Sequence, residues 1–145
     1  MIAIGCDHGG YDLKKEIIKY LTFNDIKFID FGSHNTESVN YPDYAHLVCE
    51  AIQNDQAERG ILICGTGIGM SMVANKHKGI RAACCSDTYS ARLTRMHNDA
   101  NVLCLGGRVL GTGLALDITE LFIKTEFESG RHEIRVKLIA DLEKL

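Results

Sequence analysis

Short apolar runs alternate along the chain with longer stretches in which apolar and charged residues are interleaved. The apolar runs are typical of buried strands, and they lie at Ile2–Cys6, Lys27–Phe31, Ile61–Cys64, Ile80–Cys85 and Val102–Leu105. After the first run, Leu13, Ile17 and Leu21 recur every four residues, which is the spacing of one helical face. The remaining faces of that helix carry the charged residues Lys14, Lys15, Glu16 and Lys19. Further helices are predicted near 43–55, 69–77, 88–97 and 113–127, and a last one from about 131 to 143.

Strands that alternate with helices run parallel and are covered on both faces. The pattern therefore predicts an α/β fold, a three-layer α/β/α sandwich of the Rossmann-like type with about five parallel strands. The long irregular connection Gly32–Asp43 contains the sole proline, Pro42, and it forms either the wall of a site or a plain surface loop. No repeat, low-complexity tract or linker is recognisable, so we expect residues 1–145 to form a single domain.

The amino-acid composition limits the kinds of partner that the protein is expected to bind. The 145 residues are 46% hydrophobic, which allows a substantial core without disulfide or metal staples. A formal net charge of −3 predicts no general attraction to nucleic acid or to an anionic membrane, so an anion would have to be bound by locally placed basic groups. The six cysteines include no CxxC pair, and no apolar window approaches the roughly 20 residues of a membrane span. These features are typical of a cytoplasmic protein.

Parallel sheets bind ligands at the carboxyl ends of their strands. The segments that follow the predicted strands are Asp7–Gly10, Gly65–Gly69, Ser86–Asp87 and Gly106–Arg108. Among them, the glycine-rich segment stands between a strand and a helix, where free backbone N–H groups and the helix dipole attract an anion.

A dinucleotide site is one alternative for this loop, because Asp87 follows Gly65 by about 20 residues, as a ribose-binding acid would. Against it, the spacing is G-x-G-x-G, Met70 stands at the position of the third glycine, and the motif follows the third predicted strand instead of the first. A structural turn without any ligand is the other alternative.

Cys64 stands at the edge of the same loop. A thiol beside a helix N-terminus is favoured as thiolate, and so as a base or nucleophile, although an inert core cysteine is the ordinary alternative. Asp7 and His8 follow a predicted neighbouring strand and are expected to meet Cys64 in one crevice. His97 precedes the last predicted strand and is a further acid or base candidate, and each histidine could equally be an ordinary surface residue.

Two other groups of residues have side chains that could bind a ligand. Cysteine, histidine and aspartate together could hold zinc, but CxxC, HxxxH and HExxH spacings are missing, so no metal is predicted. Arg131 and Arg135 lie four residues apart on one helical face, where two guanidinium groups can close on a phosphate. A solvated basic face, offset by Glu133, is the alternative, and Arg108 is a third phosphate candidate at a strand end.

Taken in order, these motifs resemble the B-type ribose-5-phosphate isomerase family, which also includes allose-6-phosphate and galactose-6-phosphate isomerases. The resemblance covers essentially the whole chain. It rests on the segments Gly5–Gly9, Tyr41–Ala45, Ile63–Gly69, Ala74–Lys76, His97–Asp99, Gly107–Val109 and Gly130–His132, with Arg135. A second branch of the family carries a glutamate at the position of Met70 and lacks the cysteine, and this contrast favours Cys64 as the functional group.

The resemblance implies isomerisation of a sugar phosphate through a cis-enediolate, without metal or nucleotide. It assigns Cys64 as the base between C1 and C2, and Thr66 to the hole for the enediolate oxygen. His97 would open the sugar ring with help from Asp7. The implied substrate-binding residues are His8, Tyr41, Gly65, Gly67, Ile68, Gly69, Asn98, Arg108, Arg131 and Arg135.

The family also implies a homodimer or homotetramer whose active sites combine groups from both subunits, and a place in the pentose phosphate pathway. Galactose-6-phosphate isomerases divide the site residues between unlike subunits, whereas this chain carries the complete set, so a homo-oligomer is expected. The expected substrates are D-ribose 5-phosphate and D-ribulose 5-phosphate. Allose 6-phosphate or another six-carbon sugar phosphate is an alternative, and a nucleotide-binding module without catalysis is a more distant one.

Overall fold

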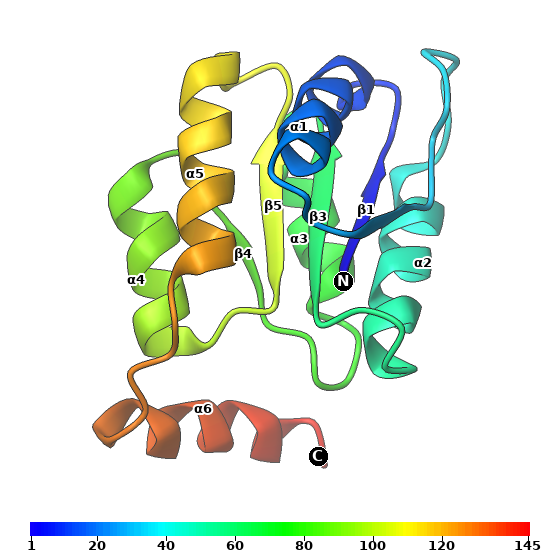
Figure 1. Cartoon of the computed structure of the whole chain (residues 1–145). Helices are drawn as coiled ribbons and strands as arrows, with labels where there is room; N and C mark the ends of the chain where they lie inside the picture. Colours follow the sequence, from blue (N-terminus) through cyan, green and yellow to red (C-terminus); the bar gives the residue numbers. More distant parts are fainter.

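The computed structural model of the chain describes residues 1–145. Five strands and six helices follow one another along the chain (Figure 1). They are β1 (Ile2–Cys6), α1 (Tyr11–Phe23), β2 (Phe28–Asp30), α2 (Tyr41–Gln53), β3 (Arg59–Cys64), α3 (Ile68–Ala74), β4 (Ala82–Cys84), α4 (Thr88–Asn98), β5 (Val102–Gly106), α5 (Thr112–Lys124) and α6 (Arg131–Leu142).

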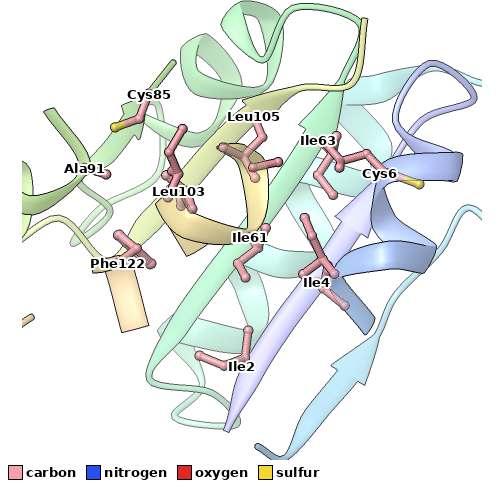
Figure 2. Packing of buried hydrophobic residues seen from close by; sticks show 14 of the residues in the cluster. Ile2, Ile4, Cys6, Ile61, Ile63, Cys85, Ala91, Leu103, Leu105 and Phe122 are labelled. Carbon is pink, nitrogen blue, oxygen red and sulfur yellow. The ribbon is translucent and has the colours of Figure 1, made fainter. Parts of the chain in front are cut away.

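All neighbouring strands are parallel, in the order β2-β1-β3-β5-β4, which confirms the predicted α/β sandwich. Alternate side chains of the central strands point to opposite faces of the sheet. On one face, Ile4, Ile61 and Leu103 pack against α1 and α5 (Figure 2). On the other face, Leu62 and Cys64 pack among residues of α2 and α3. The Cys64 side chain therefore lies on the α2 and α3 side of the sheet. No helix is both long and apolar enough to cross a membrane.

Several element boundaries differ from those predicted. Pro42 and Asp43 belong to the first turn of α2, where proline is tolerated because the N–H it lacks would have no helical partner, so the preceding irregular connection is shorter than expected. The predicted strand Ile80–Cys85 is reduced to the three residues of β4. Because β4 is an edge strand with a single neighbour, Cys84 is exposed instead of buried.

The predicted pattern of α1 was wrong at Lys14, which was assigned to a charged face of the helix outside the core. Its side chain is buried, and its Nζ atom donates to Oδ1 of Asp30 at 2.7 Å and to the carbonyl oxygen of Ser33 at 2.6 Å. The apolar spacing of α1 was correct, since Leu13, Ile17 and Leu21 are all buried. Helical periodicity alone cannot reveal that an acidic partner from β2 reaches a charged position, so the ion pair escaped sequence analysis.

Helix α6 departs from the layered arrangement. It lies beyond the end of the sandwich at which the strands begin, and it contacts α4 (Figure 1). Its only buried residue is His132. The remaining surface includes the exposed apolar side chains of Ile134, Leu138, Ile139 and Leu142. Because monomeric proteins rarely leave such a contiguous apolar face in water, this helix is a candidate interaction surface.

Candidate active site

The site begins where β1 and β3 end side by side. Cys6 is paired with Ile63, so the next residues along each strand, Asp7 and Cys64, leave the sheet at the same edge. β2 lies on the outer side of β1, whereas β5 lies on the outer side of β3. The strand order therefore reverses between β1 and β3, and such a topological switch point is the preferred place for a ligand in an open α/β sheet.

The loop after β3 wraps around the Cys64 sulfur. The Gly67 N–H donates to Sγ of Cys64 at 3.2 Å. Gly67 has a φ of 80°, and a Cβ atom there would lie 2.8 Å from the carbonyl carbon of Leu105, so only glycine fits. The turn therefore holds the Cys64 sulfur in place with a backbone hydrogen-bond donor.

Further backbone amides are available beside the sulfur. The Ile68 N–H donates to Oγ1 of Thr66 at 3.2 Å. The amides of Gly65, Gly69 and Met70 donate to no group within the chain, and those of Gly69 and Met70 lie in the open first turn of α3. Free N–H groups next to a thiol provide an oxyanion-binding environment.

The other cysteines do not share this environment. Burial raises the pKa of the Cys49 thiol to about 12 and that of Cys85 to about 11, and it raises the pKa of Cys104 well above its ordinary value. Cys84 is exposed beside the same loop, but desolvation and the nearby Cys64 raise its pKa as well. A raised pKa makes the thiolate form of each of these cysteines scarcer at neutral pH.

Asp7 and His8 are fixed by backbone groups. Oδ1 of the buried Asp7 accepts the N–H of Gly9 at 2.8 Å. Nδ1 of His8 accepts the N–H of Val39 at 3.2 Å, which ties the loop before α2 to the site. Since Nδ1 is the acceptor, Nε2 of His8 carries the proton and is free to donate to a ligand.

A pocket of about 420 Å³ opens over Asp7 and Cys64, and most of its lining residues were predicted from the sequence. The lining consists of Asp7, Tyr41, Cys64, Gly65, Thr66, Ile68, Gly69 and Met72. Tyr41 comes from the first turn of α2, and a Cβ atom on Gly69 would lie 2.8 Å from the tyrosine ring. Met72, one turn into α3 and 65% exposed, was missed because its pattern looked like that of an ordinary helix residue.

Arg108 also reaches this edge of the sheet. Its N–H donates to the carbonyl oxygen of Gly65 at 3.0 Å, and its guanidinium nitrogen lies 3.5 Å from the position a Cβ atom on Gly65 would take. The predicted phosphate candidates Arg108 and His8 therefore both belong to the Cys64 side of the molecule.

Four predicted site residues lie at the opposite end of the sheet. His97 and Asn98 are the last residues of α4, immediately before β5 begins, whereas Cys64 is paired with Gly106 where β5 ends. The five-residue strand between these points spans roughly 13 Å. Arg131 and Arg135 are exposed on α6, at the same far end (Figure 1). One chain therefore does not bring His97, Asn98, Arg131 and Arg135 together with Cys64.

The surroundings of His97 contain two groups that sequence analysis did not single out. The His97 ring is stacked on the ring of His132, with centroids 4.1 Å apart, and both histidines face Glu128. Burial lowers the pKa of His132, and the neighbouring His97 and Arg131 act in the same direction. The spacing of these three residues along the chain gives no recognisable motif, so only the packing of α6 on α4 reveals them.

Comparisons with known proteins place the chain in a family. Residues 2–139 match the ribose/galactose isomerase family. Ribose-5-phosphate isomerase B of Escherichia coli is 47% identical over 142 residues, which are 98% of this chain and 95% of that protein. The solved structure of ribose-5-phosphate isomerase B from Clostridium thermocellum is 54% identical, with a TM-score of 0.97 over 99% of this chain and 97% of that one. The Mycoplasma genitalium enzyme, solved with bound ribulose-5-phosphate, is 41% identical, with a TM-score of 0.94 over 99% of this chain and 95% of that one.

Proposed function

The chain belongs to the ribose/galactose isomerase family, and we propose that it interconverts D-ribose 5-phosphate and D-ribulose 5-phosphate with Cys64 as the base. The observation that carries the proposal is the Cys64 thiol, held by the Gly67 N–H at the strand switch point beside unpaired backbone amides. The substrate assignment is supported by the names of close relatives, including one structure with bound ribulose-5-phosphate.

The reaction needs a base and an oxyanion site in one place. The Cys64 thiolate removes the proton from C2 of the open-chain aldose, the C–H electron pair becomes the C1=C2 double bond, and the carbonyl pair moves onto O1 to give a cis-enediolate. The hydroxyl proton of O2 then passes to O1, C2=O forms, and the electron pair of the double bond takes the proton back from the thiol at C1, which produces the ketose. The free amides of the loop, with the hydroxyl of Thr66, hold the developing oxygen charge, without which a proton beside a carbonyl is too weakly acidic to remove.

Four further side chains act on the rest of the sugar in this proposal, namely those of Asp7, His97, Tyr41 and Asn98. His97 opens the furanose ring by proton transfer, with help from the carboxylate of Asp7. Tyr41 and Asn98 bind sugar hydroxyl groups. At the other end of the substrate, His8 and three arginines hold the phosphate, and this remote binding energy orients C1 and C2 at the thiol. The arginines are Arg108, Arg131 and Arg135.

We propose that two copies of the chain complete each active site. The groups beside Cys64, which we call the Cys64 half, lie at one end of the sheet. The groups at the other end, His97, Asn98, Arg131 and Arg135, form the His97 half, so neither half contains the whole set of groups. A two-fold dimer in which each copy presents its His97 half to the Cys64 half of the other would form two equivalent sites. The exposed apolar side chains of α6 supply a surface for this association, and pairs could associate again into a tetramer.

The proposed mechanism uses protein groups alone, without metal or nucleotide. A dinucleotide site gains no support, because the glycines follow β3 and the buried Met70 occupies the position of the third glycine. The reaction would belong to the pentose phosphate pathway, and the six free thiols are typical of a reducing cytoplasm.

The test is the rate of D-ribulose 5-phosphate formation from D-ribose 5-phosphate by purified protein in EDTA without any nucleotide. Rapid turnover that is lost in Cys64→Ala would support the proposal. If wild-type protein failed on ribose 5-phosphate but converted allose 6-phosphate, the substrate assignment would be wrong while the isomerase chemistry remained. Failure on both classes, together with thermal stabilisation by a nucleotide, would favour the binding-module alternative.

A further inference from the structure

Asp99 follows His97 and Asn98, the last two residues of α4, and turns the chain toward β5. Its backbone is left-handed, with a φ of 47° and a ψ of 44°. The Asp99 N–H donates to the carbonyl oxygen of Thr94, as does the N–H of Ala100 at 3.2 Å. Glycine is the usual residue at such a helix end, because it adopts this conformation without strain. The turn itself therefore does not require a carboxylate.

Two arginines hold the Asp99 carboxylate from different elements. Nη1 of Arg95, in α4, donates to Oδ1 at 3.0 Å, and Nη2 of Arg81, immediately before β4, donates to Oδ2 at 3.3 Å. Nε of Arg81 also donates to the Asp99 carbonyl oxygen at 2.9 Å. Arg95 is only 4% exposed, so water and salt screen its attraction to the carboxylate weakly. One carboxylate thus joins the end of α4 to the start of β4.

Arg95 also holds the connection that leads from α5 to α6. Its Nε atom donates to the carbonyl oxygen of Thr125, the residue after α5, at 3.2 Å. Further along this connection, the Glu128 N–H donates to the carbonyl oxygen of Met96 at 3.1 Å. The helix that follows, α6, carries two of the proposed phosphate-binding arginines. The contacts of Arg95 therefore connect the two parts of the His97 half.

Two other helix ends show the same turn without such contacts. Asp25 follows α1 and Asp55 follows α2, with φ values of 55° and 58°. Both residues are exposed, and neither carboxylate makes a hydrogen bond or an ion pair. Asp99 therefore differs from them in the partners of its side chain and not in the hand of its backbone. Asp55 is a matched control for Asp99.

We propose that Asp99 is a positioning residue of the active site, clamped by Arg81 and Arg95. By holding the last turn of α4, it keeps His97 and Asn98 in the places from which they act on the sugar. Without the carboxylate, the two guanidinium groups repel each other, and the end of α4 loses its link to β4. A displacement of about 1 Å in a reacting group can lower a rate by about 100-fold. The effect on catalysis rests on the proposed function, whereas the clamp does not.

Amide hydrogen exchange followed by NMR tests the clamp without any assay of turnover. The variant is Asp99→Gly, because glycine keeps the left-handed turn and removes the carboxylate. We expect exchange in the last turn of α4 to be at least about 10-fold faster than in the wild-type protein. In Asp55→Gly, exchange at the end of α2 should be unchanged. If Asp99→Gly does not fold, Arg81→Gln replaces it, since this change leaves the buried Arg95 paired. Unchanged exchange at the end of α4 would overturn the clamp.

The kinetics of ribose 5-phosphate turnover test the effect on the active site. We expect kcat to be about 10- to 100-fold lower in Asp99→Gly and near normal in Asp55→Gly. Asp99→Asn should lie between Asp99→Gly and the wild-type protein, because its amide oxygen accepts from one arginine but carries no charge. Faster exchange with a normal kcat would overturn the link to His97 while leaving the clamp in place.

Refolded mixtures of two variants show in which half of the site the defect lies. Mixed equally with Cys64→Ala, Asp99→Gly should reach about a quarter of wild-type turnover, because one site of each mixed dimer receives neither defect. Mixed with His97→Ala, it should be no more active than Asp99→Gly alone, since both defects then lie in the same half. The reverse pattern would overturn the assigned role of Asp99. If Cys64→Ala and His97→Ala did not complement each other, the shared site of the proposed function would be wrong, and with it the effect of Asp99 on turnover.

Discussion

The Gly67 N–H points at the sulfur of Cys64 at 3.2 Å, and this contact joins the two features that make the loop after β3 chemically useful. The left-handed backbone of Gly67 turns its amide toward the sulfur, while Gly69 and Met70 in the first turn of α3 leave their own amides unpaired. A base and an oxyanion-binding environment therefore arise from one short turn. The first two predictions concern this turn.

Replacement of Cys64 by alanine should remove proton transfer while leaving substrate binding largely intact. We expect kcat for ribose 5-phosphate to fall by about 10³-fold or more with little change in KM, since the thiol acts on the step between bound aldose and bound ketose. Steady-state kinetics measure both constants. Cys84→Ala is the control, because it removes an exposed thiol beside the same loop, and near-normal turnover in Cys64→Ala would disprove the base assignment.

Gly67→Ala should damage both stability and catalysis. The added Cβ atom would lie 2.8 Å from the Leu105 carbonyl carbon and 3.1 Å from Sγ of Cys84, at a φ of 80° that alanine adopts only with strain. We expect the free energy of unfolding to drop by about 1–3 kcal/mol and kcat to fall as the amide moves away from the sulfur. Gly113→Ala is the control in open space near the start of α5, and its stability should be unchanged or slightly raised.

The ion pair between Lys14 and Asp30 should contribute far more to the free energy of unfolding than an ordinary charged pair on a helix surface. Lys14→Met leaves the Asp30 carboxylate and the Ser33 carbonyl without their partner, and we expect a loss of about 3 kcal/mol in the free energy of unfolding. Denaturant unfolding measures this loss. The neighbouring exposed Lys15, 3.5 Å from Asp12, is the matched control, and Lys15→Met should change stability by less than about 0.5 kcal/mol. Equal effects of the two substitutions would contradict the structure.

Sequence patterns predicted the sandwich and the Cys64 half of the site because both follow from the order of strands, loops and helices along the chain. Apolar runs mark the strands, and parallel strands bring their following residues to one edge, so Asp7, Cys64 and Arg108 could be grouped without coordinates. Contacts that depend on distant packing could not be predicted. The spacing of α1 does not show that Asp30 reaches Lys14, and the position of His97 before the last strand does not show that the ring of His132 stacks on it.

Asp87 should make the stability of α4 depend on pH. Its carboxylate accepts the Ser90 N–H at 2.6 Å as the helix N-cap, and this hydrogen bond lowers the pKa of Asp87 below its ordinary value of 3.8. A lowered folded-state pKa means that the stabilisation is present above pH 3.8 and is lost as the pH falls through the folded-state value. Asp87→Ala should therefore lower the melting temperature by about 2–4 °C at pH 7 and by less at pH 3. A difference in melting temperature that stayed constant between these pH values would contradict this role.

Mixing two inactive variants should restore activity if the active site is shared between copies. Cys64→Ala lacks the base in one half of the site, and His97→Ala lacks the ring-opening group in the other half. In a heterodimer, one of the two sites receives both defects and the other receives neither. If the two chains are unfolded, mixed equally and refolded together, half of the dimers are mixed, so turnover should reach about a quarter of the wild-type value. Each variant refolded alone is the control, and a mixture no more active than these controls would show that His97 and Cys64 do not meet across an interface.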